Sequence, residues 1–164
     1  MTFTPIIGTL GYVLSADGGQ VLLIHRNARP DDEAFGKYNG LGGKLEADED
    51  VASGMAREIR EEAAIVVTHM VLRGTISWPG FGKNGEDWLG FIFLVDGWQG
   101  EESSANHEGT LHWIPLNTLL AGGVPLWPGD KHFLPLVFDG DTRPFHGLMP
   151  YEGQVQPASW SFTR

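Results

Sequence analysis

Short apolar blocks alternate with polar and glycine-rich segments along the chain, and they predict strands and helices in succession. Ile6–Leu14 and Gln20–His25 are expected as two strands joined by the turn Ala16–Gly19. The Asp-Gly-Gly sequence of this turn supplies the positive-φ positions that a tight connection needs, which predicts a hairpin. Further strands are expected at Ile65–Leu72, at Thr75–Trp78, at Leu89–Val95 and near Pro144–Tyr151.

The clearest helical period lies within Asp48–Ala64. Asp48 is expected as the N-cap, because an aspartate oxygen accepts from the free N–H groups of a first turn. His132–Phe138 predicts a second, short amphipathic helix, and Trp113–Leu120 fits either a strand or a helix that starts near Pro115. In the first helix, apolar residues recur every three or four positions and should form its packed face: Ala52, Met55, Ala56, Ile59 and Ala63.

Two segments read as loops. Asn27–Gly43 is rich in Gly, Pro and Asp, and Gly122–Pro128 is rich in turn residues. Loops of more than ~12–15 residues without regular structure are uncommon unless they are functional or disordered. The first segment is therefore a candidate part of a functional site.

The composition fits a single domain spanning residues 1–164, since this length falls in the usual range for one domain. The chain has no cysteine, which excludes disulfides, thiolate catalysis and cysteine-based metal sites. Its apolar runs are far shorter than the ~20 residues of a membrane span. The N-terminus lacks the signal-peptide pattern of a basic segment followed by a long apolar one. We therefore expect a cytoplasmic protein without membrane contact.

The charge balance is acidic, with 21 Asp and Glu against 11 Lys and Arg and a formal net charge of −10. Binding to a nucleic-acid polymer or to an anionic membrane needs clustered basic residues, and those of this chain are scattered. An acidic protein that binds a polyphosphate needs a divalent cation between the two negative partners.

Three glutamates of the predicted helix form an acidic cluster away from its apolar face. Glu58, Glu61 and Glu62 are related by steps of three and four residues, so they share one side of the helix. Three glutamates alone also fit an ordinary solvated face. In a cleft they would repel one another, and Mg²⁺ would compensate, because it takes one or two carboxylates together with substrate phosphates. Arg57 is placed to pair with Glu61 four residues on.

The context of this cluster carries a family resemblance. Residues 43–65 resemble the Nudix box, which has a Gly, five residues, a Glu, seven residues, and then Arg-Glu-apolar-x-Glu-Glu-x-Gly-apolar. Ala64 departs from this pattern, because it stands where the family has Gly. The matching positions are Gly43, Glu49, Arg57, Glu58, Ile59, Glu61, Glu62 and Ile65.

The resemblance implies an α/β (α+β) protein with the Nudix fold, a mixed β-sheet sandwiched between α-helices, in which the box forms a loop–helix–loop. It also implies hydrolysis, dependent on Mg²⁺ or Mn²⁺, of a nucleoside diphosphate linked to another group. Carried over by position, Glu58, Glu62 and the Gly42 carbonyl become metal ligands. Glu61 becomes a further ligand or the base that activates water. Glu49 and Arg57 support this arrangement.

A second resemblance concerns the MutT-like enzymes that remove oxidised purine nucleoside triphosphates. Phe35–Lys44, Leu126–Leu136 and Phe145–Gly147 are similar to segments of that group. The similarity implies that Trp127 stacks on a purine, that Asp130 reads the edge of the base, and that Asn39 completes the recognition, with Lys44 also among the substrate-binding residues. Gly129 departs, since it replaces the first member of the acidic pair of those enzymes.

Several other residues can be interpreted either as functional or as structural. Glu108 sits where many family members place a late glutamate that faces the metals, and it could equally be an exposed loop acid. Trp78 and Phe81 fit a nucleotide pocket or the core. The histidines show no metal-ligand spacing and are expected as structural or surface residues: His25, His69, His107, His112, His132 and His146.

The sequence thus favours a Mg²⁺-dependent Nudix pyrophosphohydrolase. It would convert a purine nucleoside triphosphate, such as 8-oxo-dGTP, to the monophosphate and pyrophosphate, acting as a monomer or homodimer. One alternative keeps the enzyme class and changes the substrate to ADP-ribose, a dinucleoside polyphosphate or another nucleotide sugar. A non-catalytic nucleotide-binding module is the other.

Overall fold

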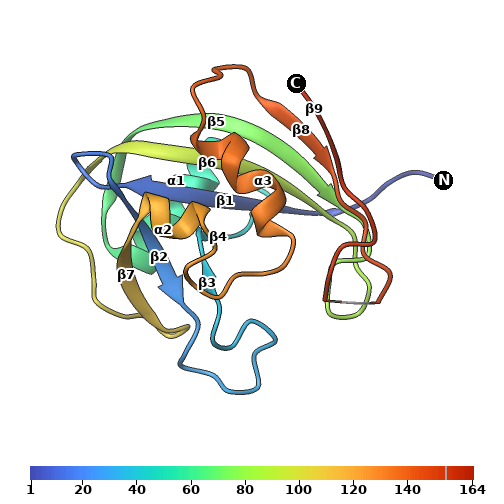
Figure 1. The fold of residues 1–164 in the computed structure, drawn as a ribbon, viewed down its shortest axis with the longest axis horizontal. Coiled ribbons are helices and arrows are strands. Elements are labelled where there is room, and N and C mark those ends of the chain that lie inside the picture. The colour runs from blue at the N-terminus through green and yellow to red at the C-terminus, as the bar shows by residue number, and fades with distance from the viewer. Residues whose placement is uncertain (154) are drawn as a thin grey trace.

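Over residues 1–153 and 155–164, which the computed structural model describes, the chain forms nine strands and three helices (Figure 1). The strands are β1 (Ile6–Leu14), β2 (Gln20–His25), β3 (Tyr38–Asn39), β4 (Leu41–Lys44), β5 (Val66–Trp78), β6 (Trp88–Gln99), β7 (Thr110–Pro115), β8 (Phe145–Leu148) and β9 (Ser161–Thr163). The helices are α1 (Val51–Ala63), α2 (Leu116–Leu120) and α3 (Asp130–Phe138).

The strands belong to one mixed sheet, in the order β3-β2-β1-β6-β5-β8-β9. β1 lies near its centre, parallel to β6 and antiparallel to both β2 and β4. β7 pairs with β2. The pairing of β4 with β1 places Gly42 opposite Leu10 and Gly43 opposite Thr9, so the glycine-rich segment lies against the middle of the sheet.

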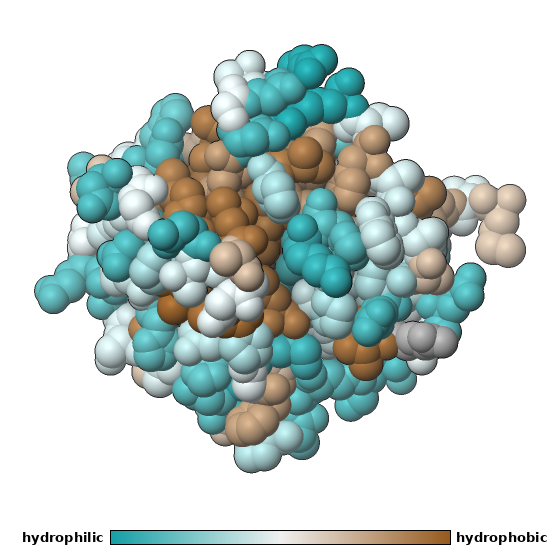
Figure 2. Space-filling view, in the orientation of Figure 1, coloured by the Kyte–Doolittle hydropathy of each residue, from teal (hydrophilic) through white to brown (hydrophobic). Residues whose placement is uncertain are grey.

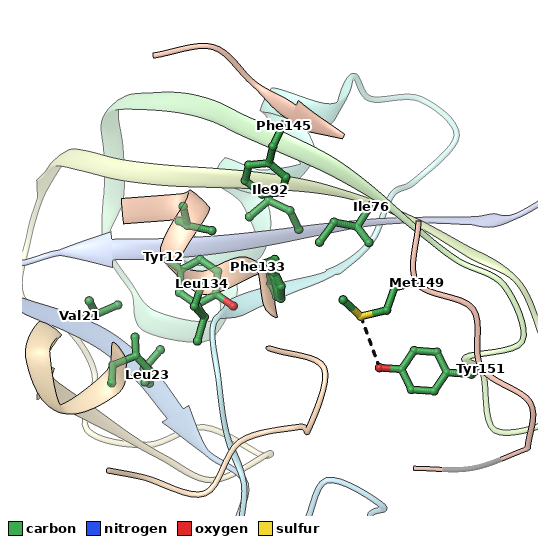
Figure 3. Packing of buried hydrophobic residues seen from close by; sticks show 12 residues of the cluster. Tyr12, Val21, Leu23, Ile76, Ile92, Phe133, Leu134, Phe145, Met149 and Tyr151 are labelled. Atoms are coloured by element: carbon green, nitrogen blue, oxygen red, sulfur yellow. Dashed lines mark hydrogen bonds between the residues drawn. The ribbon is translucent and has the colours of Figure 1, made fainter. Parts of the chain in front are cut away.

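Helices cover both faces of the sheet, as expected. In Figure 1, α2 and α3 lie on the near face and α1 lies behind the sheet. Neighbouring residues of the central strands point to opposite faces, so Tyr12 belongs to the near core and Val13 to the far one. The near core packs against Phe133 and Leu134 of α3 (Figure 3), and the far core packs against Met55 of α1. Apolar residues also gather around α2 and α3 on the near surface (Figure 2).

The start of α1 differs from the prediction. The N-cap is Asp50, whose side chain accepts from the Ser53 N–H at 2.9 Å, and the helix begins at Val51. Asp48 was therefore the wrong cap among three neighbouring acids. Ala52, expected on the packed face, is exposed, because the later start leaves it at the open end of the first turn.

Other boundaries also shift. The two strands predicted at Ile65–Leu72 and Thr75–Trp78 form one long strand, β5, with register shifts between Leu72 and Gly74. The ambiguous segment Trp113–Leu120 divides at Pro115, between β7 and α2. The predicted loop Asn27–Gly43 contains β3 and most of β4, because both segments pair with the sheet. β9 was not predicted.

Candidate active site

The glycine-rich strand β4 and the helix α1 meet where the candidate glutamates lie. The Gly42 N–H donates to Oε2 of Glu62 at 3.3 Å. A Cβ atom at Gly43 would lie 2.5 Å from Oε1 of Glu58, and one at Gly42 would lie 1.9 Å from the Thr9 carbonyl oxygen. Only glycine at both positions lets the two carboxylates approach the backbone of β4 while that strand stays paired with β1.

Arg57 holds the acidic residues around it in place. Its guanidinium donates to both oxygens of Glu49, at 2.8 and 2.6 Å, and to the Lys44 carbonyl at 3.2 Å. Nη1 also donates to Glu58 at 3.0 Å and to Glu61 at 3.2 Å, so the expected pair with Glu61 is present. The bidentate contact with Arg57 lowers the pKa of Glu49 to about 2.

The three helix glutamates are buried to different degrees. Glu62 is 7% exposed, whereas the side chain of Glu61 is 59% exposed. Burial, followed by the nearby charges of Glu108 and Glu58, raises the pKa of Glu62 to about 8. Burial also raises the pKa of Glu58. A carboxylate in such a position is stabilised by a positive partner, and within the described residues Glu62 has no direct ion pair.

Glu108 joins this group from the loop before β7. It ion-pairs with Arg26 at 3.1 Å, and Arg26 also binds Asp32. A pocket of about 440 Å³ is lined by Glu108 and Gly42 together with box residues that include Gly43, Arg57, Glu58, Glu61 and Glu62. We call it the glutamate pocket. Lys44 and His107 lie at its edge.

The glutamate pocket offers oxygen ligands that suit a hard divalent cation such as Mg²⁺. The predicted ligands Glu58, Glu61 and Glu62 line it, as does Gly42, whose carbonyl is the fourth predicted ligand. Among the described residues, no three acidic or histidine side chains are already arranged as a metal cluster, and Arg57 binds two of the carboxylates. A cation bound here would give the buried Glu62 carboxylate a positive partner.

A second cavity lies beside the glutamate pocket, and six of the residues that line it are aromatic. Its volume is about 210 Å³, and we call it the aromatic cavity. Gly42 and Gly43 line both spaces, so the aromatic cavity and the glutamate pocket adjoin at β4. The other residues that line it include Tyr12, Arg26, Asn39, Trp78, Phe81, Trp88, Trp127, Asp130 and Tyr151.

The three predicted base-binding residues, Asn39, Trp127 and Asp130, come together in the aromatic cavity. The Trp127 ring meets Phe81 edge-on at 5.7 Å, and Nζ of Lys37 lies 4.7 Å from its centroid. Asp130 is the first residue of α3, and burial raises its pKa to about 7. Its carboxyl group is therefore able to accept or to donate near neutral pH.

Lys44 does not line the aromatic cavity with the three base-binding candidates. It lines the glutamate pocket, and its Nζ lies 5.7 Å from the ring of Trp88, which lines the aromatic cavity. Trp78 and Phe81 were predicted to lie in a nucleotide pocket or in the core. They line the aromatic cavity and also pack against the near core. Sequence reasoning missed Arg26, Tyr12, Trp88 and Tyr151. Arg26 directly follows the β2 strand, a position that could have been flagged, but Tyr151 reaches the cavity only through tertiary packing.

Comparison with known proteins gives a family match. A model of the NUDIX domain matches residues 6–137 of the chain. The chain is 30% identical over 152 residues to the uncharacterized Nudix hydrolase YvcI of Bacillus subtilis, with 90% of this chain and 89% of that protein covered. It is 27% identical to the oxidized purine nucleoside triphosphate hydrolase of Danio rerio, with 92% and 90% covered.

The fold has a close counterpart among solved structures. The crystal structure of a MutT protein from Bacillus halodurans matches with a TM-score of 0.79 and 27% identity, covering 96% of this chain and 97% of that one. Within the described residues, no helix is long and apolar enough to cross a membrane.

Proposed function

The chain belongs to the Nudix hydrolase family, and on that premise we propose that it hydrolyses a purine nucleoside triphosphate, such as 8-oxo-dGTP, in a Mg²⁺-dependent reaction. One water is consumed, one P–O–P bond breaks, and the products are the nucleoside monophosphate and pyrophosphate. Mn²⁺ is expected to substitute for Mg²⁺, because it also accepts oxygen ligands.

One observation carries the proposal: the aromatic cavity and the glutamate pocket share Gly42 and Gly43. A nucleotide has an apolar, flat base at one end and a polyphosphate at the other. A base in the aromatic cavity would direct its phosphates across β4 toward the carboxylates. The relative from Danio rerio, whose name states an oxidized purine nucleoside triphosphate substrate, supports the same reading.

The glutamates have separate roles in this proposal. Glu58, Glu62 and the Gly42 carbonyl would hold the cation, which would supply charge neutralisation at the phosphates and a lowered pKa for a water molecule. Glu61 is the most exposed of the three, and it accepts the proton of the attacking water. Arg57, fixed on Glu49, sets the positions of Glu58 and Glu61.

The base-binding residues act through contact and hydrogen bonding. Trp127 presents a rigid aromatic face for stacking, and Asp130 and Asn39 bind the polar edge of the base. We also propose that the protein acts in the cytoplasm, as a monomer or homodimer, on free nucleotides rather than on a nucleic-acid polymer.

The test is a panel of nucleotides assayed with Mg²⁺ for released pyrophosphate and monophosphate. The panel contains oxidised and normal purine triphosphates, pyrimidine triphosphates, ADP-ribose and dinucleoside polyphosphates. We expect the highest kcat/KM for a purine triphosphate, with loss of activity in excess EDTA and recovery with Mn²⁺. Faster hydrolysis of ADP-ribose or of a dinucleoside polyphosphate would contradict the proposed substrate class, and inactivity toward every compound would contradict the reaction itself.

A further inference from the structure

Gly129 leaves room for the hydroxyl group of Tyr151, a residue that lines the aromatic cavity. A Cβ atom at Gly129 would lie 2.6 Å from the Tyr151 oxygen and 2.9 Å from the Met149 sulfur. Gly129 itself is buried and directly precedes Asp130. Residue 129 itself has no polar side-chain atom, and the polar atom that lies over it belongs to Tyr151, 22 positions later in the chain.

Tyr151 is held firmly, and its hydroxyl is poorly satisfied by the protein. Its backbone N–H donates to the Pro79 carbonyl at 2.8 Å, and its ring packs edge-on against Phe81 at 5.1 Å. The residue is only 8% exposed. Within the described part of the chain, its hydroxyl donates only to the Met149 sulfur at 3.9 Å (Figure 3), which is a weak acceptor. A buried donor without a strong acceptor is costly unless a ligand accepts from it.

Tyr151 and Asp130 face the same cavity. Both line it together with Trp127. Burial, followed by the negative charge of Asp130, raises the pKa of Tyr151 to about 12, so the phenol keeps its proton at any ordinary pH. The lining of the cavity thus includes one residue with a permanent O–H donor and one with a carboxyl group.

We propose that Tyr151 is a specificity-determining residue whose hydroxyl donates a hydrogen bond to the edge of the bound base, next to the groups that Asp130 binds. This inference rests on the proposed function. A guanine-type base suits the pair, because its ring N–H and amino group can face the two oxygens of one carboxylate while the neighbouring carbonyl accepts from the phenol. Adenine offers only one donor group on that edge, so it makes fewer hydrogen bonds.

The first experiment compares Tyr151→Phe with Tyr38→Phe. The control removes a phenol that does not line the cavity, because Tyr38 stacks on His25. For guanine-type triphosphates we expect Tyr151→Phe to raise KM about tenfold with kcat nearly unchanged, and Tyr38→Phe to match the wild type. The ratio of kcat/KM between guanine-type and pyrimidine triphosphates should fall by the same factor, since a smaller base does not reach Tyr151. A partly unfolded variant would leave this ratio intact.

The second experiment uses the space at residue 129. The methyl group of Gly129→Ala would meet the Tyr151 hydroxyl, so this variant should displace it and raise KM as Tyr151→Phe does. In the Tyr151→Phe background the same substitution should add little, which makes the two effects non-additive. Affinity for the guanine-type monophosphate, measured by calorimetry with EDTA present, should follow the same pattern without catalysis.

The outcomes separate the two proposals. If the wild type hydrolyses no purine triphosphate, the proposed function fails. If the wild type does so, but Tyr151→Phe equals Tyr38→Phe in KM, in base ratio and in product affinity, the inference about Tyr151 fails alone. Fully additive effects of Gly129→Ala and Tyr151→Phe would also overturn it.

Discussion

Single carboxylates in this molecule differ because of their immediate surroundings. Glu49, gripped by Arg57, has its pKa lowered to about 2. Glu62, buried near Glu58 and Glu108, has its pKa raised to about 8, and burial raises that of Asp130 to about 7. The first residue is a fixed anion that holds Arg57, whereas Glu62 lines the glutamate pocket and Asp130 lines the aromatic cavity.

Glu62→Gln tests the buried carboxylate. The amide keeps the size of the side chain and its acceptor for the Gly42 N–H, so the thermal midpoint should stay within a few degrees of the wild type. Turnover should fall by about two orders of magnitude or more, because several kcal/mol of charge stabilisation depend on this group. Steady-state kinetics and thermal unfolding, with the exposed Glu101→Gln as control, measure both effects. Full activity of Glu62→Gln would remove it from the site.

Asp130→Asn tests the carboxyl group of the aromatic cavity through pH. A carboxyl group with an ordinary pKa of 3.8 and a folded pKa of about 7 binds a proton more tightly in the folded state. Its contribution to stability is therefore lost as pH rises from about 4 to 7 and stays lost above that. The variant should unfold at the same temperature as the wild type at pH 4 and at a clearly higher temperature at pH 8. There the difference in the free energy of unfolding should reach up to about 4 kcal/mol, because one pKa unit corresponds to about 1.4 kcal/mol.

Calorimetry from pH 4 to pH 8 measures the unfolding temperature of both proteins, and the exposed Asp31→Asn is the matched control. A constant offset between Asp130→Asn and wild type at every pH would contradict the raised pKa.

At the scale of elements, α1 ends in a strained residue. Ala64 adopts a left-handed conformation, with φ of 60° and ψ of 21°, and its N–H still donates to the Arg60 carbonyl at 3.0 Å. This conformation explains why the family pattern has glycine at this position, because a Cβ atom disfavours it. The chain therefore keeps the geometry of the loop–helix–loop in spite of the substitution.

Ala64→Gly should stabilise the protein. Relief of the left-handed conformation is worth about 1 kcal/mol, which raises the thermal midpoint by about 2–4 °C. Activity should not change, since Ala64 lines neither the glutamate pocket nor the aromatic cavity. Ala52→Gly, at an exposed position inside the same helix, should instead lower the midpoint. A lower midpoint for Ala64→Gly would show that the strain is absent.

At the scale of the whole molecule, Arg73 ties β5 to the segment that follows α3. It is 5% exposed, and its guanidinium donates to the carbonyls of Leu136, Val137, Asp139 and Asp141 and to the Asp139 carboxylate. Arg164 binds Asp139 as well, at 2.6 Å. These contacts anchor α3, whose first turn carries Asp130, against the far end of the sheet.

Arg73→Met should lower the free energy of unfolding by about 2–4 kcal/mol, because several buried carbonyl groups lose their donor. Urea unfolding should show an earlier midpoint with an unchanged slope. Arg60→Met, at an exposed position of α1, is the control and should be near neutral. A loss below about 0.5 kcal/mol for Arg73→Met would show that other contacts anchor α3.

The family and the grouping of the box residues could be predicted from fixed spacings within one helix and one loop. The mixed sheet between helices was predicted because the family resemblance implies it. The cap of α1 could not, since Asp48, Glu49 and Asp50 compete and only tertiary contacts assign Glu49 to Arg57. The continuity of β5 could not be predicted either, because the strand pairing shifts register between Leu72 and Gly74, where the charged side chain of Arg73 is buried. Tyr151 depends on packing between distant segments.

The most direct test of the central claim is a crystal structure with Mn²⁺ and a non-hydrolysable purine nucleoside triphosphate. The claim is that one nucleotide spans the aromatic cavity and the glutamate pocket across Gly42 and Gly43. We expect the base to lie against Trp127 and Asp130. We also expect anomalous Mn²⁺ density between the phosphates and the carboxylates of Glu58 and Glu62. A base bound outside the aromatic cavity, or Mn²⁺ bound away from these glutamates, would contradict it.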